Sequence, residues 1–357
     1  MRKFVLIICF LFNCALEAHC QYLKPFADSI RKVCKIPELG YAVVSSDRVL
    51  ELDVAGTKKW GTHLAAKKTD LFRIGSNTKA ITGFIAALLV KQNKISWNTH
   101  FFDLFPELKA GSRKEYYDLT LLNLLSFRGR LFAYTYTNDT PVKGQFTGTE
   151  DEQLYQFAAW FFKHKPVDSQ DSIHFSNLGY IAVGLMLEKV SGESYKQLVA
   201  DLGKELQIDF RFGQPNAIDS NQPWGHNAEL VPEPPADNYK LNWLLPAGNI
   251  TMSLPDYVKF IQLQLQGLAG KSDILTKDEF QFLHFGLARF SVGWFWDTDE
   301  DGRRYSHNTG NPGTFLTNVY VYPGSARAFV LFSNAQTDPA AEGMGVLYEE
   351  MKRRYIR

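Results

Sequence analysis

The chain has 357 residues, of which 39 are lysine or arginine and 38 are aspartate or glutamate, so the formal net charge is +1. This balance argues against a nucleic-acid partner, because proteins that bind nucleic acids usually carry a clustered basic surface. The length and a hydrophobic fraction of 45% are sufficient for one large domain, or two closely packed ones, around a sizeable core.

The first 20 residues have the pattern of a secretory signal peptide. Arg2 and Lys3 precede an apolar stretch over residues 4–16, which is too short for a convincing transmembrane helix. We expect cleavage just before Gln21 and therefore a secreted or periplasmic protein, with an uncleaved membrane anchor as the alternative. Three of the four cysteines lie in this leader, so the mature chain keeps only Cys34 and has no intrachain disulfide.

Beyond the leader, the patterns predict one domain over residues 21–357. A short helix is expected near 24–35, and the runs GYAVVSS and VLELDVAG predict two strands joined by a turn. The chain is then mainly helical, with long loops over about 211–248, until a series of β-rich runs and a last helix near 338–354. We expect the strands from both ends, in sheet regions of about 21–75 and 285–357, to form one antiparallel sheet beside a helical region of about 76–284.

The segment FRIGSNTKAITGFIAALL, residues 72–89, is the most informative part of the chain. Its apolar residues recur at helical spacing, which predicts an amphipathic core helix with one apolar stripe. Ser76 and Lys79 are three residues apart, so they share one face of that helix and can touch. A serine hydroxyl needs a group to take its proton, and a desolvated lysine can do this. Because Ser-x-x-Lys also occurs by chance, the spacing alone does not establish catalysis.

Four segments resemble, in their order along residues 36–350, the serine β-lactamases and penicillin-recognising hydrolases. The match is to the class C β-lactamase-like branch, which includes esterases and D-amino-acid peptidases. The segments are LFRIGSNTKAITGFIAALL for the nucleophile helix, HFSNLGYIAVGLMLEKVSG for the second motif, PAGNITMSLPDYVKF for the Ala-Gly stretch before a helix, and SHNTGNPGTF for the third-motif strand. The resemblance implies an α/β (α+β) fold of the β-lactamase/transpeptidase type, with an antiparallel sheet flanked by helices plus a helical domain. It also implies that Ser76 is the nucleophile and that no metal or organic cofactor is needed.

The second motif departs from the family pattern Tyr-x-Asn, in which the tyrosine takes part in proton transfer. Here Phe175 occupies the tyrosine slot and Asn177 the asparagine slot. A phenylalanine carries no proton, so Lys79 works alone, a water or a neighbour substitutes, or catalysis is weak. His174 and Tyr180 are the nearest substitutes in sequence, but we expect His174 to point elsewhere and Tyr180 to lie one helical turn away. Asn177 is predicted to bind a substrate amide, and capping of the following helix is the alternative role.

The third motif departs as well. The class C β-lactamases have Lys-Thr-Gly in this strand, whereas this chain has Asn308, Thr309 and Gly310, so the fixed cation that helps to hold a carboxylate is absent. The resemblance implies that the amide of Asn311 pairs with that of Ser76 as an oxyanion hole. The neighbouring His307 is predicted to orient substrate, although a histidine on a strand is structural about as often as functional, and Gly310 lets the strand backbone approach a ligand.

A third departure lies at SFRGRL, residues 126–131, where the family usually has a Thr-His-x-Ser-Gly-Leu type segment. Arg130 replaces the glycine, so the turn must differ. The sequence does not tell whether Arg128 and Arg130 face the cleft, and a solvated loop is the expected placement.

Two functions from different classes fit these residues. The first is an envelope serine hydrolase that acylates Ser76 with an ester, a D-amino-acid peptide or a lactam; the substrate is a small molecule or a peptide, which includes peptidoglycan-derived peptides. The second is a pseudoenzyme that binds peptidoglycan peptides or a protein partner, with Phe175 marking lost chemistry. The sequence does not predict the oligomeric state.

Overall fold

The computed structural model describes residues 22–169, 171–236 and 239–356. The predicted signal peptide lies outside the described residues. Within them, Cys34 is a free cysteine. None of the helices in this part of the chain is long and apolar enough to cross a membrane.

A six-stranded antiparallel sheet joins the two ends of the chain, as predicted. Its strands lie in the order β2-β1-β9-β8-β7-β6, so β1, from the N-terminal part, pairs with β9, from the C-terminal part. The register places Leu39 opposite Ser333 and Ser45 opposite Arg327. The strands are β1 (Glu38–Ser45), β2 (Val49–Gly56), β6 (Phe295–Thr298), β7 (Arg304–Gly310), β8 (Leu316–Tyr322) and β9 (Arg327–Ser333).

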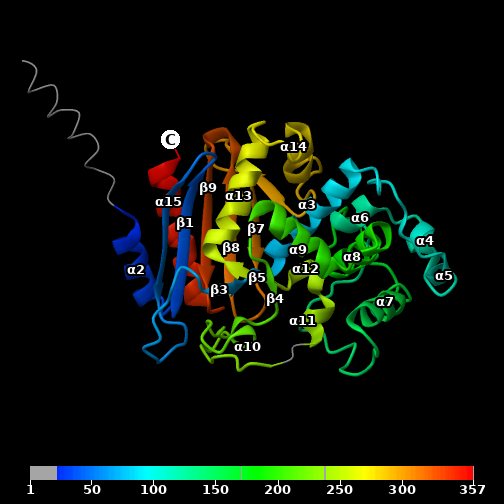
Figure 1. The fold of residues 1–357 in the computed structure, drawn as a ribbon, viewed down its shortest axis with the longest axis horizontal. Helices are drawn as coiled ribbons and strands as arrows, with labels where there is room; N and C mark the ends of the chain where they lie inside the picture. The colour runs from blue at the N-terminus through cyan, green and yellow to red at the C-terminus, as the bar shows by residue number, and fades with distance from the viewer. Residues whose placement is uncertain (1–21, 170, 237–238, 357) are drawn as a thin grey trace, which may run out of the picture.

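Helices cover both faces of this sheet because its central strands are apolar on both sides. β1 is buried along its whole length, and β9 is buried from Ala328 onward. The helices α2 (Lys24–Val33) and α15 (Asp338–Tyr355) pack together on one face, where Leu347 and Met351 enter a small core of their own. On the other face α13 (Leu254–Leu268) lies across β1 and β9 (Figure 1).

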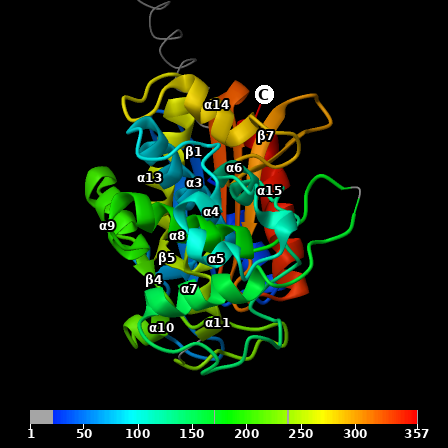
Figure 2. The ribbon, with the colours of Figure 1, turned by 90° about the vertical axis from the view of Figure 1, so that its right-hand side faces the viewer.

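The rest of the chain forms a helical region beside the sheet (Figures 1 and 2). Most of its helices share one large hydrophobic core with α13 and with the face of the sheet that α13 covers. The elements of this part are α3 (Thr78–Lys91), α4 (Phe101–Leu104), α5 (Pro106–Lys109), η2 (Lys114–Tyr116), α6 (Leu121–Leu125), α7 (Glu150–Phe161), α8 (Leu178–Ser191), α9 (Tyr195–Leu206), α10 (Pro215–Ile218), α11 (Tyr239–Trp243), α12 (Leu245–Gly248) and α14 (Lys277–Phe285). The antiparallel sheet with flanking helices confirms the predicted fold class, whereas the expected division of the chain near residues 75 and 284 stays a prediction.

The helix α3 differs from the amphipathic helix that the sequence predicts. Its polar residues Thr78, Lys79 and Thr82 are buried together with its apolar ones, so it has no solvent-exposed polar face along its first three turns. The physical reason is its position, because α3 packs against α8, α9, α12 and α14 at once. A helix surrounded on all sides needs internal partners for each polar group, and this one has them.

A second, three-stranded sheet leads into the turn that carries Ser76, the predicted nucleophile, and this turn is called the nucleophile turn below. The strands are β3 (Leu71–Arg73), β4 (Arg211–Phe212) and β5 (Ile250–Ser253), in the order β3-β5-β4. β3 leads directly into the 3₁₀ turn η1 (Gly75–Asn77) and then into α3. Because β5 pairs with β3 and follows α12, the PAGN stretch lies beside the nucleophile turn.

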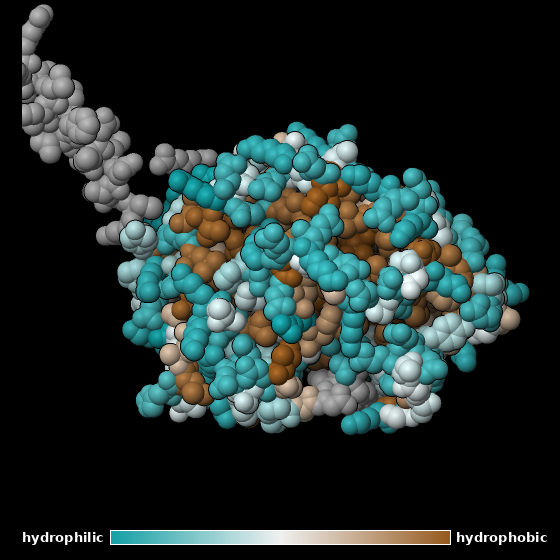
Figure 3. All heavy atoms as spheres, viewed as in Figure 1, coloured by the Kyte–Doolittle hydropathy of each residue, from teal (hydrophilic) through white to brown (hydrophobic). Residues whose placement is uncertain are grey.

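Polar side chains dominate the outer layer of the face in Figure 3, and apolar side chains show mainly in the recesses between elements. This distribution agrees with a chain whose basic and acidic residues nearly balance.

Candidate active site

Ser76 and Lys79 meet at the point where η1 passes into α3. Lys79 is only 1% exposed. Its Nζ lies 2.9 Å from Ser76 Oγ, 2.8 Å from Asn177 Oδ1 and 2.7 Å from the carbonyl oxygen of Ala247. A neutral amine has two N–H groups and one lone pair, so the two acceptor oxygens can take both N–H groups and leave the lone pair for the serine hydroxyl.

Burial lowers the pKa of Lys79 from its ordinary value to about 7. Among the described residues, no carboxylate lies within ion-pair distance of its amine, so nothing there counteracts the desolvation. A large fraction of Lys79 is therefore neutral near physiological pH, which is the state in which a lysine can accept a proton.

Asn177, the residue just before α8, holds this amine in place. It occupies the N-cap position of that helix, but its side chain makes no capping bond there. Instead Oδ1 accepts from Lys79 and Nδ2 donates to the carbonyl of Tyr134 at 2.9 Å. The structure thus places Asn177 next to the lysine, and the alternative role as a side-chain helix cap is wrong.

The end of β7 lies against the nucleophile turn. A Cβ atom built on Gly310 would be 1.9 Å from the carbonyl oxygen of Ile74, so only glycine fits this contact. A Cβ built on Gly75 would be 2.7 Å from the amide nitrogen of Asn311. The backbone of Asn311 therefore lies beside the residue that precedes Ser76, which is where the predicted oxyanion hole needs a donor.

Asn308 braces the site from the slot that a lysine occupies in class C β-lactamases. Its Nδ2 donates to the carbonyl of Gly293 at 2.8 Å and to the carbonyl of Ser76 at 3.3 Å, and the residue is buried. The amide group thus ties β7 to the nucleophile turn without adding a charge to the cleft.

His307 forms part of the wall of the cleft. Its ring stacks on Phe295 with the centroids 5.7 Å apart. Burial lowers the pKa of His307, with the Asp297 carboxylate acting in the opposite direction. At neutral pH the ring is therefore an uncharged surface for a substrate, and the exposed Thr309 follows it along the strand.

These residues surround a cleft of about 460 Å³. Phe175 is 42% exposed at this cleft and packs against Phe127 with ring centroids 4.9 Å apart. Its own centroid lies 5.5 Å from Lys79 Nζ. The lining consists of Ser76, Lys79, Thr135, Tyr136, Thr137, Phe175, Asn177, Phe295, His307, Asn308, Thr309 and Asn311.

Neither sequence neighbour of Phe175 supplies the missing phenol. His174 turns away, with its Nε2 2.8 Å from the carbonyl of Asp171. The hydroxyl of Tyr180 is buried and donates to the carbonyl of Leu125 at 2.8 Å, and burial raises its pKa well above the ordinary value. Both side chains are thus occupied elsewhere, as the sequence led us to expect.

Arg128 and Arg130, in the segment 126–131 that departs from the family pattern, do not line the cleft. Arg128 donates to the carbonyls of Ser126, Ala288 and Phe290, so it holds loops together. Arg130 has a positive φ of 54° and donates from Nε to the carbonyl of Val167. In the described part of the chain, both arginines therefore bind loop carbonyls and take no part in the cleft.

Sequence reasoning missed the part of the wall formed by Thr135, Tyr136 and Thr137. These residues lie in the irregular loop between α6 and α7, which shows no periodic pattern that would place them. The tether of this loop to Asn177 through the Tyr134 carbonyl bridges 43 positions of the chain. The sequence analysis also missed the carbonyl of Ala247 as an acceptor for Lys79, although it had singled out the PAGN stretch that contains this residue.

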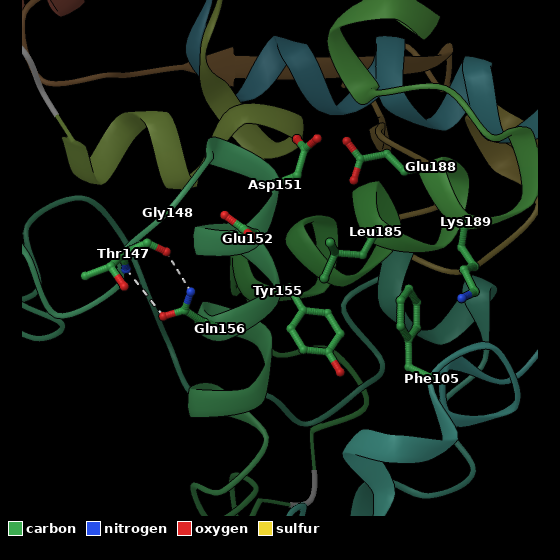
Figure 4. Close-up of a pocket in the computed structure, with 10 residues that line it drawn as sticks. All are labelled: Phe105, Thr147, Gly148, Asp151, Glu152, Tyr155, Gln156, Leu185, Glu188 and Lys189. Atoms are coloured by element: carbon green, nitrogen blue, oxygen red, sulfur yellow. Dashed lines mark hydrogen bonds between the residues drawn. The ribbon is translucent and has the colours of Figure 1, made fainter.

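A second cavity, of about 620 Å³, lies between α7 and α8 and shares no lining residue with the cleft (Figure 4). In Figure 4 the carboxylates of Asp151 and Glu188 lie close together at one end of this cavity, and the rings of Tyr155 and Phe105 line its other end. Burial and the Asp151 charge raise the pKa of Glu188 to about 7, although the hydrogen bond that Glu188 accepts from the Tyr195 amide lowers it. The lining residues of this cavity include no serine beside a base, in contrast to the Ser76–Lys79 pair of the cleft.

A family model described as Beta-lactamase matches residues 26–348, almost the whole described chain. The chain belongs to the β-lactamase family. Solved members of similar fold include the octameric penicillin-binding protein homologue from Pyrococcus abyssi, with a TM-score of 0.73 at 17% identity over 91% of this chain and 76% of that one. The D-alanine carboxypeptidase AmpC from Burkholderia cenocepacia has a TM-score of 0.71 at 16% identity and covers 90% of this chain and 96% of its own.

Curated relatives of this β-lactamase family member are distant in sequence. Protein flp of Staphylococcus aureus strain MW2 is 21% identical over 318 residues, 85% of this chain, and the match covers 60% of that protein's length. Penicillin-binding protein 4 of Amycolatopsis lactamdurans is 23% identical over 343 residues, 88% of this chain and 85% of its own. The chain is thus related to β-lactamases and penicillin-binding proteins.

Proposed function

We propose that the protein is a serine acyl hydrolase in which Ser76 is the nucleophile and Lys79 the general base. The observation that carries this proposal is the set of three contacts at the Lys79 amine. Two acceptor oxygens hold it, the serine hydroxyl takes the third position, and burial lowers its pKa to about 7, so a large fraction of it is neutral near physiological pH. A lysine with a purely structural role would be expected to keep its charge and to pair with a carboxylate.

The reaction follows from this geometry. The lone pair of Lys79 takes the proton of Ser76 as Oγ attacks the carbonyl carbon of the substrate. The amides of Ser76 and Asn311 stabilise the negative charge on the carbonyl oxygen, the leaving group departs, and water then hydrolyses the acyl-enzyme.

The cleft favours a substrate without a carboxylate next to the scissile bond. Lys79 is the one lysine or arginine among its described lining residues, and Asn308 replaces the cation of the third motif. The rings of Phe175, Phe295 and His307 add an uncharged aromatic wall. We therefore favour an ester, or a peptide bond in a neutral setting, over D-alanyl peptides or lactams that end in a carboxylate.

Matched substrates test this proposal. We expect a neutral acyl ester to be hydrolysed with a kcat/KM at least about tenfold above that for the same acyl group on D-alanine with a free carboxylate. Ser76→Ala should abolish both activities while the melting temperature stays close to that of the parent. Preference for the carboxylate substrate would reject the substrate class, and full activity of Ser76→Ala would reject the mechanism.

Phe175 supports one alternative, a binding protein without turnover. It puts a carbon ring where related enzymes carry a phenol. Such a protein would bind peptidoglycan peptides or a protein partner in the cleft and would form no covalent intermediate at Ser76.

We also propose that the protein acts in the cell envelope or outside the cell, on the basis of the sequence of residues 1–20. N-terminal sequencing of secreted material should find a start near Gln21. Recovery of chains from the cytosol that still carry Met1 would contradict this location.

A further inference from the structure

The acyl-transfer reaction needs a proton donor as well as a base, and the slot of the family's phenol holds none. When an ester is cleaved, the departing alkoxide must receive a proton. Phe175 cannot supply it, and His174 and Tyr180 are held elsewhere. Lys79 carries the proton of Ser76 but is bound to Asn177 and Ala247. A second group in the cleft is therefore required for an efficient reaction.

Tyr136 is the one tyrosine among the described residues that line the cleft. Its position is fixed through the loop that carries it, because the carbonyl of Tyr134 accepts from both Nδ2 and the backbone amide of Asn177, at 2.9 and 3.3 Å. The same Asn177 holds the Lys79 amine. The side chain of Asn177 thus positions both Lys79 and the loop, and Tyr136 is two residues beyond the point of contact at Tyr134.

The hydroxyl of Tyr136 lies over the turn that carries the oxyanion amide. A Cβ built on Gly313 would be 2.7 Å from this hydroxyl, so glycine at that position makes room for it. The amide of Gly313 donates to Oδ1 of Asn311 at 2.9 Å, which joins the two residues in one turn. None of the described residues forms a hydrogen bond with the Tyr136 hydroxyl, which leaves it available to a substrate.

The charges around Tyr136 suit a donor that is briefly deprotonated. Burial raises the pKa of Tyr136, so the phenol carries its proton at neutral pH. The Arg73 guanidinium lowers this pKa, and the Glu233 carboxylate raises it. Arg73 is itself buried, and its Nε and Nη1 have no hydrogen-bond partner among the described residues. Its Nη1 is 4.0 Å from the Glu233 carboxylate. A buried guanidinium with unused N–H groups can stabilise a transient phenolate.

We propose that Tyr136 protonates the leaving group in place of the missing phenol of the second motif, which rests on the acyl-transfer function proposed above. In acylation, Ser76 Oγ bonds to the carbonyl carbon, its proton goes to Lys79, and the bond to the departing alcohol breaks as that oxygen takes the proton of Tyr136. In deacylation, water gives a proton to the Tyr136 phenolate as its oxygen attacks the acyl carbon, and Ser76 Oγ leaves with the proton held by Lys79.

The leaving group of the substrate provides the test. We expect Tyr136→Phe to lower kcat/KM for alkyl esters by about 100-fold, because an alkoxide needs a proton, and by less than about threefold for 4-nitrophenyl esters, whose phenolate leaves unprotonated. Labelling of Ser76 by a fluorophosphonate, which expels fluoride, should be unchanged. Tyr155→Phe, which removes a hydroxyl from the second cavity, is the matched control and should alter neither ester.

Each other outcome decides against the proposal. Equal losses for both ester classes would show that Tyr136 only shapes the cleft, and no loss for alkyl esters would show that another donor acts. If the parent protein hydrolyses neither ester and takes no label at Ser76, the proposed function itself fails and this inference falls with it. A parent that is labelled and active, with an unchanged Tyr136→Phe variant, would overturn the role of Tyr136 alone.

Discussion

At the scale of single residues, the described lining of this cleft has no second lysine or arginine, which sets it apart from the class C enzymes that the chain resembles. With Asn308 in the lysine slot, no neighbouring positive charge lowers the pKa of Lys79, and burial is the cause of its shift. The pKa of this proposed base therefore depends on desolvation by the packing of α3 against α8 and α12, and not on a neighbouring positive charge that could also bind a substrate carboxylate.

The pH dependence of acylation follows from the pKa of Lys79. Below about pH 7 the amine is protonated and cannot accept the serine proton, so the labelling rate of Ser76 by a fluorophosphonate should rise with pH and level off above about pH 8. Lys79→Arg should abolish labelling, because a guanidinium does not give up its proton. A rate that is constant from about pH 5 to pH 9, or an active arginine variant, would show that Lys79 is not the base.

Phe175→Tyr tests how much the site lacks the phenol of its relatives. The ring centroid of Phe175 lies 5.5 Å from Lys79 Nζ, so we expect the added hydroxyl to enter the cleft beside Ser76 and Lys79. We expect kcat/KM for alkyl esters to rise about tenfold, and by a larger factor in the Tyr136→Phe background, where no other phenol lines the described cleft. The measurement is ester hydrolysis by the two single variants and the double variant. Equal effects in both backgrounds would mean that the two phenols do not share a role.

The sequence predicted the residues whose positions depend on short spacing. Ser76 and Lys79 touch because three residues on a helical turn bring side chains together, whatever surrounds them. The position of Tyr136 could not be predicted in this way, because it depends on a hydrogen bond between Asn177 and the carbonyl of Tyr134, which are 43 positions apart in the chain. The bracing role of Asn308 was equally hidden, because it requires the carbonyls of Gly293 and Ser76 from other segments.

At the scale of elements, the contact between β7 and the nucleophile turn decides whether the oxyanion hole can form. A Cβ on Gly310 would overlap the carbonyl oxygen of Ile74, whereas a Cβ on Gly324, in the turn after β8, meets no atom within 4 Å. We expect Gly310→Ala to destabilise the fold by about 1–3 kcal/mol and to reduce ester hydrolysis by about 100-fold or more. Gly324→Ala is the control and should behave as the parent in both thermal unfolding and activity. A fully active Gly310→Ala variant would contradict the predicted oxyanion donor.

The pairing of α7 with α8 makes the stability depend on pH. The pKa of Glu188 is about 7 in the folded protein, above its ordinary value, so its contribution is fully present below about pH 4.5 and is lost as the pH rises through about 7. Glu188→Gln keeps an oxygen acceptor for the Tyr195 amide. It should remove up to about 3 kcal/mol of the decrease in the free energy of unfolding that occurs as the pH rises. Denaturant unfolding at several pH values measures it, with the exposed Glu193→Gln as the control. Parallel curves for Glu188→Gln and the parent would contradict the assignment.

Helix α3 shows why element type was easier to predict than element environment. Its apolar spacing indicated a helix, and a helix is present over Thr78–Lys91. The same spacing suggested a single apolar stripe, but α8, α9 and α12 also bury the polar residues Thr78, Lys79 and Thr82. Periodicity within one segment cannot report partners that come from distant segments.

At the scale of the whole molecule, the site is assembled from the two regions that the chain visits in turn. The nucleophile turn and Asn177 come from the first half of the chain, and β7 closes the cleft from the C-terminal strands of the large sheet. Ser76, Lys79, Asn177 and Asn311 therefore meet only in the complete fold. This arrangement explains why the order of the four motif segments was a better guide to the fold than any single motif.

The central claim is that Ser76 forms a covalent acyl-type intermediate, and intact mass spectrometry after exposure to a fluorophosphonate tests it most directly. We predict a single adduct per chain, which peptide mapping places on Ser76, and no adduct in the folded Ser76→Ala variant. A parent protein that is folded and takes no label, or a Ser76→Ala variant that is still labelled, would contradict the claim.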